Sequence, residues 1–208
     1  DPNQQLQAFY NCRMANVTPN VRKGNLRAAC KVNGANSSMF ICTQADYPLD
    51  CNNRKTCNQP IWTSDYKQNK TYYQYHAESG QPERITYQAN EQGVAPVTRF
   101  HYSQFKAKYY KNNASNKEEG SPIWLKDSEK TCIKTATSTD GCAGGDKDEV
   151  VKTFEYNHDN LFLTGMTVKA FDPVINDFVT KRTCYQYDIY GNKTAETQPK
   201  ANPKSCSQ

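Results

Sequence analysis

The chain has 208 residues, 36% of them hydrophobic and 12% aromatic, including 14 tyrosines. This aromatic content excludes a chain that is disordered by composition, and the length allows one large domain or two small ones. The formal net charge of +5 is spread along the chain, and the densest basic positions are Arg22–Lys23 and the pair Lys106 and Lys108. A protein that binds nucleic acid in a groove concentrates its basic residues, so we expect no nucleic-acid partner.

The first 60 residues differ from the rest of the chain. They hold five of the nine cysteines and show little alternation of apolar and polar residues. This composition predicts a Cys-rich, loop-dominated N-terminal cap over residues 1–60 and a continuous β-sheet region over 61–208. No helix is predicted, because β-branched residues, Asn and Gly interrupt every apolar pattern with a helical period.

The cysteine spacing favours disulfides over a metal site. The sequence has no Cys-x-x-Cys pair, and His76, His101 and His158 do not stand at ligand spacing from any cysteine. We therefore expect no metal and no cofactor. Disulfides imply an oxidising compartment, so the protein is expected to be secreted, at a cell surface or periplasmic. The opening DPNQQLQAFYNC does not have the pattern of a signal peptide, and no apolar stretch nears the roughly 20 residues of a transmembrane segment.

Four aromatic segments share one pattern. They are TYYQY at 71–75, TRFHY at 98–102, KTFEY at 152–156 and TCYQY at 183–187. Each has aromatic residues at its third and fifth positions, a period of two that sends both rings to one face of a strand. The pattern predicts an internal repeat of strands, in which the terminal tyrosines Tyr75, Tyr102, Tyr156 and Tyr187 have a structural role.

A hairpin turn should follow the repeat strands. In the clearest copy, Asp188 can begin a type I turn with its carboxylate accepting backbone N–H groups, while Gly191 takes the left-handed conformation that a following bulge requires. The copy after Tyr75 is looser, with His76 in place of the acid and Gly80 one position later. The turn residues after the third segment are NHDN, and the second segment is followed by SQF without a glycine.

Disulfide pairs are predicted from closeness along the chain. Cys132 and Cys142 flank a turn-forming TSTDG, and Cys184 and Cys206 bracket the final hairpin. Cys51 and Cys57 are the next most local pair, which leaves Cys12, Cys30 and Cys42 to share one bridge and one free thiol. Spacing alone does not determine this connectivity.

The sequence Tyr-Asp-x-x-Gly-Asn at 187–192, preceded by alternating aromatics and recurring in degraded form, resembles the RHS/YD repeat of bacterial Rhs proteins, the BC components of Tc toxins and animal teneurins. The resemblance covers about residues 60–200. It implies a mainly β fold, an antiparallel hairpin ribbon that forms a curved sheet or partial shell. In full-length members this shell encloses a C-terminal toxin, in teneurins it supports adhesion, and the repeats themselves are not catalytic.

The resemblance does not extend to self-cleavage. Family members that cleave themselves use a segment such as Asp-Pro-x-Gly-Leu, whereas Asp172–Pro173 is followed here by Val-Ile-Asn. Four or five repeats are also too few to close a large cage, so the resemblance implies a fragment or a small stand-alone member of the family.

Enzymatic alternatives find little support in the sequence. Two polar segments, 111–120 and 143–148, are predicted as loops. Carboxylates cluster at these segments, at Glu118–Glu119 and at Asp146, Asp148 and Glu149. Acid–base chemistry or a calcium ion could use them, but solvated turns are the more common structure for such segments. His76 and His101 are more often exposed sheet residues than general bases, and no known nucleophile or phosphate-binding motif is present. We therefore expect no catalytic residue.

Binding is the better supported class of function. Tyrosine offers a large ring with a polar tip, which suits sugars and protein partners. The tyrosines predicted for binding are Tyr72, Tyr87, Tyr109, Tyr110 and Tyr190, and the alternative is that such rings form the core of the sheet. One hypothesis is a structural or interaction module of an exported Rhs-like protein that binds a protein or carbohydrate at a cell surface or an associated toxin. The other is a small secreted or periplasmic binder or inhibitor with a YD-type sheet.

Overall fold

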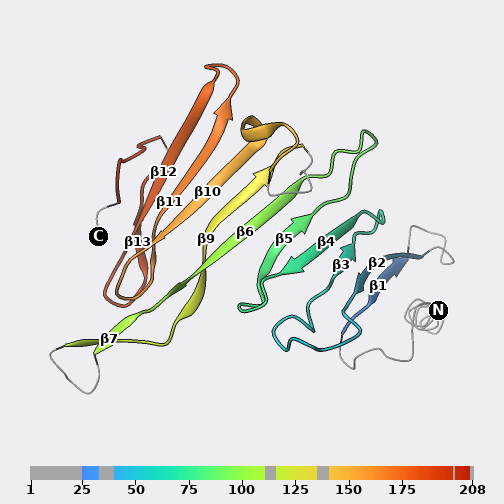
Figure 1. The fold of residues 1–208 in the computed structure, drawn as a ribbon, viewed down its shortest axis with the longest axis horizontal. Helices are drawn as coiled ribbons and strands as arrows, with labels where there is room; N and C mark the ends of the chain where they lie inside the picture. The colour runs from blue at the N-terminus through green and yellow to red at the C-terminus, as the bar shows by residue number, and fades with distance from the viewer. Residues whose placement is uncertain (1–24, 33–39, 111–115, 135–140, 199, 207–208) are drawn as a thin grey trace. The chain divides into compact units, whose positions relative to one another are not determined.

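The computed structural model describes residues 25–32, 40–110, 116–134, 141–198 and 200–206 (Figure 1). Within these ranges the regular structure is antiparallel β-sheet, apart from one 3-10 turn, η1 (Gly145–Asp148). The prediction of a mainly β fold is therefore confirmed. The chain divides into two compact units, Asp1–Ala95 and Pro96–Gln208, which are described in turn.

The first unit contains five antiparallel strands in chain order. They are β1 (Ala28–Val32), β2 (Phe40–Asp46), β3 (Trp62–Ser64), β4 (Lys70–Tyr75) and β5 (Pro82–Thr86). Disulfides join Cys30 to Cys42, which face each other across β1 and β2, and Cys51 to Cys57 in the β2–β3 connection. The Cys-rich segment thus contributes two strands to this sheet, whereas its composition predicts a separate loop-dominated cap ending near residue 60.

The second unit contains six antiparallel strands and a small two-stranded ribbon. The six, in spatial order, are β6 (Val97–Phe105), β9 (Ile123–Cys132), β10 (Glu149–Tyr156), β11 (Leu163–Asp172), β12 (Asp177–Tyr187) and β13 (Lys193–Glu196). The ribbon of β7 (Lys108–Tyr110) and β8 (Lys117–Glu119) is inserted between β6 and β9. Residues 117–119 of the predicted loop 111–120 therefore form a strand, β8. All three residues of β8 are polar and exposed, so the sequence shows no apolar alternation that would indicate a strand there.

Each repeat tyrosine faces a β-bulge on its partner strand. Gln74 pairs with Arg84 and Tyr75 pairs with Pro82, so Glu83 is an extra residue on β5. The same register shift occurs beside Tyr102, Tyr156 and Tyr187, where the extra residues are Asp127, Thr164 and Thr194. Because the bulge recurs at the same place in all four copies, the sequence repeat is also a structural repeat.

Three hairpin turns share one hydrogen-bond pattern. The residue after the tyrosine donates its N–H to the carbonyl of the last turn residue, and its side chain accepts a backbone N–H; these residues are His76, Asn157 and Asp188. A residue with positive φ stands two positions before the return strand: Gly80 at 73°, Leu161 at 59° and Gly191 at 85°. Gly191 therefore has the left-handed conformation predicted for it, and Leu161 has it without any sequence signal.

A further turn of the same kind precedes β4. Asp65 accepts the N–H groups of Lys67 and Asn69 at 2.8 and 2.9 Å, and Gln68 has a φ of 68°. Asp188 binds Tyr190 and Asn192 in the same way, with both distances 2.9 Å. The Asp65 turn was missed in the sequence because glutamine replaces the glycine that marks the left-handed position.

The repeat aromatics of the second unit lie on one face of its sheet. Residues that pair directly across antiparallel strands share a face, and Tyr102 faces Lys126 while Phe154 faces Met166. The Nζ of Lys126 lies 5.1 Å from the ring centroid of Phe100 and 4.6 Å from that of Phe154. The ammonium group of Lys126 thus lies over two of the rings, and it also pairs with Glu129 at 2.9 Å.

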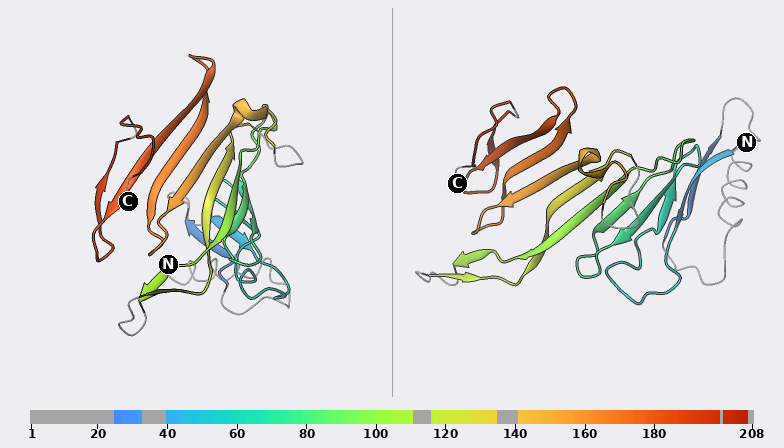
Figure 2. Two further views of the ribbon diagram at one scale, coloured as in Figure 1. Left: turned by 60° about the vertical axis from the view of Figure 1, so that its left-hand side comes forward. Right: turned by 45° about the horizontal axis from the view of Figure 1, so that its top comes forward.

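The strands of each unit form a single layer, as Figure 2 shows for the described residues. Among these residues, the buried hydrophobic side chains are Cys57, Val97, Tyr102, Cys132, Cys142 and Cys184. Four of the six are disulfide-bonded cysteines. Since one sheet layer cannot enclose a large apolar core, cross-links and side-chain ladders contribute an unusual share of the stability.

Three of the disulfides join cysteines that the sequence analysis pairs. Cys51–Cys57 lies in the first unit, and Cys132–Cys142 and Cys184–Cys206 lie in the second. Cys132 binds Cys142 across the loop that follows β9, and Cys184 on β12 binds Cys206 near the C-terminus. One bridge and one free thiol were predicted among Cys12, Cys30 and Cys42, and of these Cys12 lies outside the described residues. Cys30 and Cys42 bind each other.

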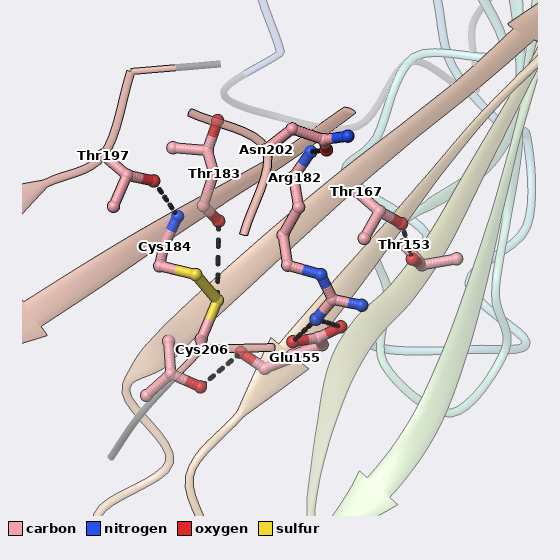
Figure 3. Close-up of polar contacts among 10 residues, drawn as sticks. Thr153, Glu155, Thr167, Arg182, Thr183, Cys184, Thr197, Asn202 and Cys206 are labelled. Carbon is pink, nitrogen blue, oxygen red and sulfur yellow. Dashed lines mark hydrogen bonds and ion pairs between the residues drawn. A yellow bond between two sulfur atoms is a disulfide. The ribbon is translucent and has the colours of Figure 1, made fainter. Parts of the chain in front are cut away.

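The C-terminal segment is fastened to β12 by side-chain hydrogen bonds as well as by its disulfide (Figure 3). Asn202 Oδ1 accepts the N–H of Arg182 at 2.8 Å, and Thr197 Oγ1 accepts the N–H of Cys184 at 2.8 Å. The guanidinium of Arg182 donates to Glu155 Oε2 on β10 at 2.6 Å. These contacts satisfy backbone groups of β12 in the stretch that precedes its pairing with β13.

Candidate functional site

A hollow of about 300 Å³ lies where the β10–β11 and β12–β13 turns meet. Nine residues line it: Asn157, Asn160, Phe162, Thr164, Tyr185, Gln186, Tyr187, Asp188 and Thr194. Two of them, Thr164 and Thr194, are the extra residues of the third and fourth bulges. The hollow is therefore a product of the repeat, formed where two bulged hairpins end side by side.

Close packing fixes the position of the two turns. The rings of Phe162 and Tyr187 lie with centroids 4.9 Å apart. Gly191 comes so near that a Cβ atom added to it would be 2.8 Å from Cζ of Phe162. The glycine is required here both for its positive φ and for this approach, so one sequence signal accounts for the turn and for one wall of the hollow.

Part of the polar lining is already used by the turns. Asn157 Oδ1 accepts the N–H of Phe162 at 3.2 Å, and Thr164 Oγ1 donates to the carbonyl of Glu155 at 3.2 Å. Asp188 accepts three hydrogen bonds, two from backbone N–H groups and one from the side-chain amide of Asn192. These bonds lower the pKa of Asp188, the side-chain bond from Asn192 contributing most, and keep its carboxylate ionised.

The tyrosines predicted for binding are all exposed. Their exposed fractions range from 43% at Tyr87 and 47% at Tyr72 and Tyr109 to 60% at Tyr110 and 83% at Tyr190. Tyr190 stands at the tip of the Asp188 turn, although it is not among the residues that line the hollow. The structure thus leaves these rings available to a partner, with Tyr72 and Tyr87 in the first unit and Tyr109, Tyr110 and Tyr190 in the second.

The repeat tyrosines have partners within the protein. Tyr102 is only 6% exposed. The hydroxyl of Tyr156 donates to the carbonyl of Lys126 at 2.7 Å, and that of Tyr75 donates to the carbonyl of Pro60 at 2.8 Å. Burial, with smaller effects of Tyr73 and Tyr47, raises the pKa of Tyr75 to about 12, which keeps this donor protonated. Their hydrogen bonds tie one repeat to the chain beside it.

His101, Ser103 and Asp127 come together around the second bulge, a cluster that their sequence separation conceals. Nδ1 of His101 lies 2.7 Å from Oδ1 of Asp127, and Ser103 donates its hydroxyl proton to Oδ2. Burial opposes ionisation of Asp127, but the bonds from Ser103 and His101 outweigh it, so its pKa is lowered. A nucleophilic serine needs a base that accepts its proton. Here both Ser103 and His101 are hydrogen-bonded to the carboxylate of Asp127, which is ionised and of low basicity.

Asp148 is the exception to the expectation of solvated carboxylate loops. It is only 5% exposed, and its Oδ1 accepts the N–H of Lys134 at 2.9 Å. Its Oδ2 is buried without a hydrogen-bond partner. Glu118 and Glu119 are exposed in β8, as expected for polar surface. In the part of the chain that the structure describes, no three His, Cys, Asp or Glu side chains form a group that could hold a metal ion.

The fold defines a class of protein by its construction, an antiparallel sheet of bulged, aromatic hairpins cross-linked by disulfides. No family model matches this chain, and no curated protein matches it. Among the described residues, no helix is long and apolar enough to cross a membrane.

Proposed function

We propose that this protein is a non-catalytic structural and interaction module of an exported YD-repeat protein, acting as a segment of a shell or as a surface adhesin. The observation that carries the proposal is the repeated hairpin. Each of the four YD-like tyrosines faces a bulge at the same position of its strand pair. Such a unit can be added in series to lengthen a ribbon, which is the construction that the resemblance to RHS/YD repeats implies.

The surface chemistry supports binding as the activity. The four described disulfides suit an oxidising compartment, where such a module would meet other cells or exported proteins. The exposed tyrosines suit that role because each offers a large, rigid contact area at small cost in side-chain entropy. The cluster at Asp127 supports a structural role for His101 and Ser103, since both are held by one ionised carboxylate.

Cell binding tests the proposal directly. The oxidised, fluorescently labelled chain is incubated with intact bacteria and with cultured animal cells, and bound fluorescence is measured against protein concentration. A variant with Tyr72, Tyr87, Tyr109, Tyr110 and Tyr190 replaced by Ser should lose at least tenfold in apparent affinity, because the exposed rings supply the contacts.

The matched control replaces Phe178, Val174 and Ile175, which are exposed apolar residues of the β11–β12 hairpin, by Ser. This control should bind as the parent does. Saturable binding that is equal in all three proteins would show that the exposed tyrosines do not contribute to the interaction. Absence of binding to every cell type would contradict a role as a surface adhesin.

A further inference from the structure

We propose that the hollow at the β10–β11 and β12–β13 turns binds a neutral saccharide, stacked on its aromatic wall and hydrogen-bonded to its unused amide and hydroxyl groups. This inference rests on the proposed function as a binding module and names the ligand class of one site. It goes beyond the exposed tyrosines, since none of those five residues lines the hollow.

The aromatic part of the lining suits the apolar face of a sugar ring. Three aromatic side chains line the hollow, Phe162 from the turn and Tyr185 and Tyr187 from β12. The contact between Phe162 and Tyr187 holds these rings in place before any ligand arrives. A preorganised aromatic wall binds with little loss of side-chain entropy, and the C–H groups on one face of a pyranose supply the apolar surface that it accepts.

The polar part of the lining offers free hydrogen-bonding groups. The side chains of Asn160 and Thr194 line the hollow, and neither forms a hydrogen bond with another residue in the part of the chain that the structure describes. Thr164 uses its hydroxyl proton on Glu155 and keeps its oxygen as an acceptor. An amide and a hydroxyl beside a carboxylate provide both donors and acceptors at short range, which is the chemistry that recognises neighbouring hydroxyl groups of one ring.

The charge of the hollow selects against anionic ligands. Asp188 is its one carboxylate, and no Lys, Arg or His is among the nine lining residues. The Nζ of the adjacent Lys193 lies 5.6 Å from the ring centroid of Tyr185, and its charge is already paired with Glu196 at 2.7 Å. An acidic sugar would therefore bring a second negative charge next to Asp188 without a counter-ion, whereas a neutral sugar can donate its hydroxyl protons to that carboxylate.

The size of the hollow limits the ligand. At about 300 Å³ it lies at the small end of the range of about 300–1,000 Å³ for ligand pockets. It is formed by two turns and the adjoining ends of three strands and does not follow a strand, so it suits one or two sugar units. A single shallow subsite of this kind binds weakly, which makes ligand-detected measurements the appropriate test.

The test uses saturation-transfer NMR on the oxidised full chain. The neutral probes are the methyl pyranosides of glucose, galactose and mannose together with N-acetylglucosamine, and the anionic probe is N-acetylneuraminic acid. At least one neutral probe should give a saturable signal that exceeds that of the anionic probe. The double variant Asn160→Ala with Thr194→Val should weaken its affinity at least fivefold, because it removes two polar groups that line the hollow. Both residues are exposed and their side chains form no hydrogen bond among the described residues, so the fold should be retained.

The matched control is Thr180→Val, an exposed threonine on β12 outside the hollow, which should leave the affinity unchanged. Absence of signal from every neutral probe, equal binding by the double variant, or stronger binding of N-acetylneuraminic acid would each overturn the inference. These outcomes are independent of the cell-binding assay. A chain that binds cells through its exposed tyrosines and binds no neutral sugar keeps the proposed function and loses the saccharide site.

Discussion

At the scale of single residues, Gly191 combines two demands that are usually separate. Its φ of 85° belongs to the left-handed region, and a Cβ atom would lie 2.8 Å from Phe162. Gly145 has a φ of 67° and nothing within 4 Å of the equivalent position. Both glycines belong to the same unit. A comparison of substitutions at the two positions therefore distinguishes the cost of backbone strain from the cost of steric overlap.

Gly191→Ala should therefore destabilise the second unit more than Gly145→Ala does. Left-handed strain costs on the order of 1 kcal/mol at either position, and displacement of Phe162 adds about 1–2 kcal/mol at Gly191. Urea unfolding followed by tyrosine fluorescence measures both values. Equal losses in the two variants would show that Phe162 moves freely and that the contact does not fix the turns.

Residue types predict part of these turns. Asp188 and Gly191 signal theirs clearly, because an acid that accepts backbone N–H groups and a glycine at positive φ are the preferred residues. Leu161 and Gln68 have the same backbone conformation with side chains that disfavour it, so their positions depend on the surrounding hairpins. The hollow was not predictable, since its lining joins two turns about 30 residues apart.

At the scale of elements, the ladder of charges across β9 and β10 stabilises the aromatic face. Glu129 lies between Lys126 at 2.9 Å and Lys152 at 2.7 Å. Burial raises the pKa of Glu129, but its bonds to Lys152 and Lys126 outweigh this effect, so the pKa falls below its ordinary value of 4.5. The folded state thus holds the ionised form more firmly than the unfolded chain does.

A group whose pKa is lowered on folding adds stability above its unfolded pKa and loses it as the pH falls through the folded value. The free energy of unfolding of the second unit should therefore decline from about pH 4.5 downward. Glu129→Gln should cost about 1 kcal/mol at pH 7 and flatten this decline, after allowance for screening of the half-exposed lysines. Denaturant titrations from pH 7 to pH 3 measure both effects.

Glu196→Gln provides the control for this experiment. Its pair with Lys193 is exposed on both sides and joins residues three apart on β13, so its removal should leave the free energy of unfolding nearly unchanged. A pH profile that is the same for parent and Glu129→Gln would show that the ladder does not contribute to acid stability.

The aromatic period locates strands well and describes their pairing poorly. The segments 71–75, 98–102, 152–156 and 183–187 all fall within strands β4, β6, β10 and β12. A bulge was predicted after Gly191, where Thr194 is the extra residue. The bulges at Glu83, Asp127 and Thr164 were not predicted, because an extra residue on the partner strand leaves no mark in the aromatic period of the first strand. The ribbon of β7 and β8 was also not predicted, because its short polar strands show no alternation of apolar and polar residues.

At the scale of the whole molecule, the disulfides compensate for a small core. Four bridges link the described cysteines, and each typically contributes about 2–4 kcal/mol. Peptide mapping without reduction should find Cys30–Cys42, Cys51–Cys57, Cys132–Cys142 and Cys184–Cys206 in the native protein. Nine reactive thiols in freshly isolated protein would contradict both the fold and the oxidising compartment.

The bulges also have a consequence for how such a chain can change in evolution. Because each hairpin contains its own extra residue opposite its own tyrosine, its strand pairing is set locally and does not depend on the copies before it. A duplication or loss of one hairpin therefore leaves the pairing register of the remaining strands unchanged. The insertion of β7 and β8 after the second tyrosine illustrates this tolerance, since the third and fourth copies keep the same register shift.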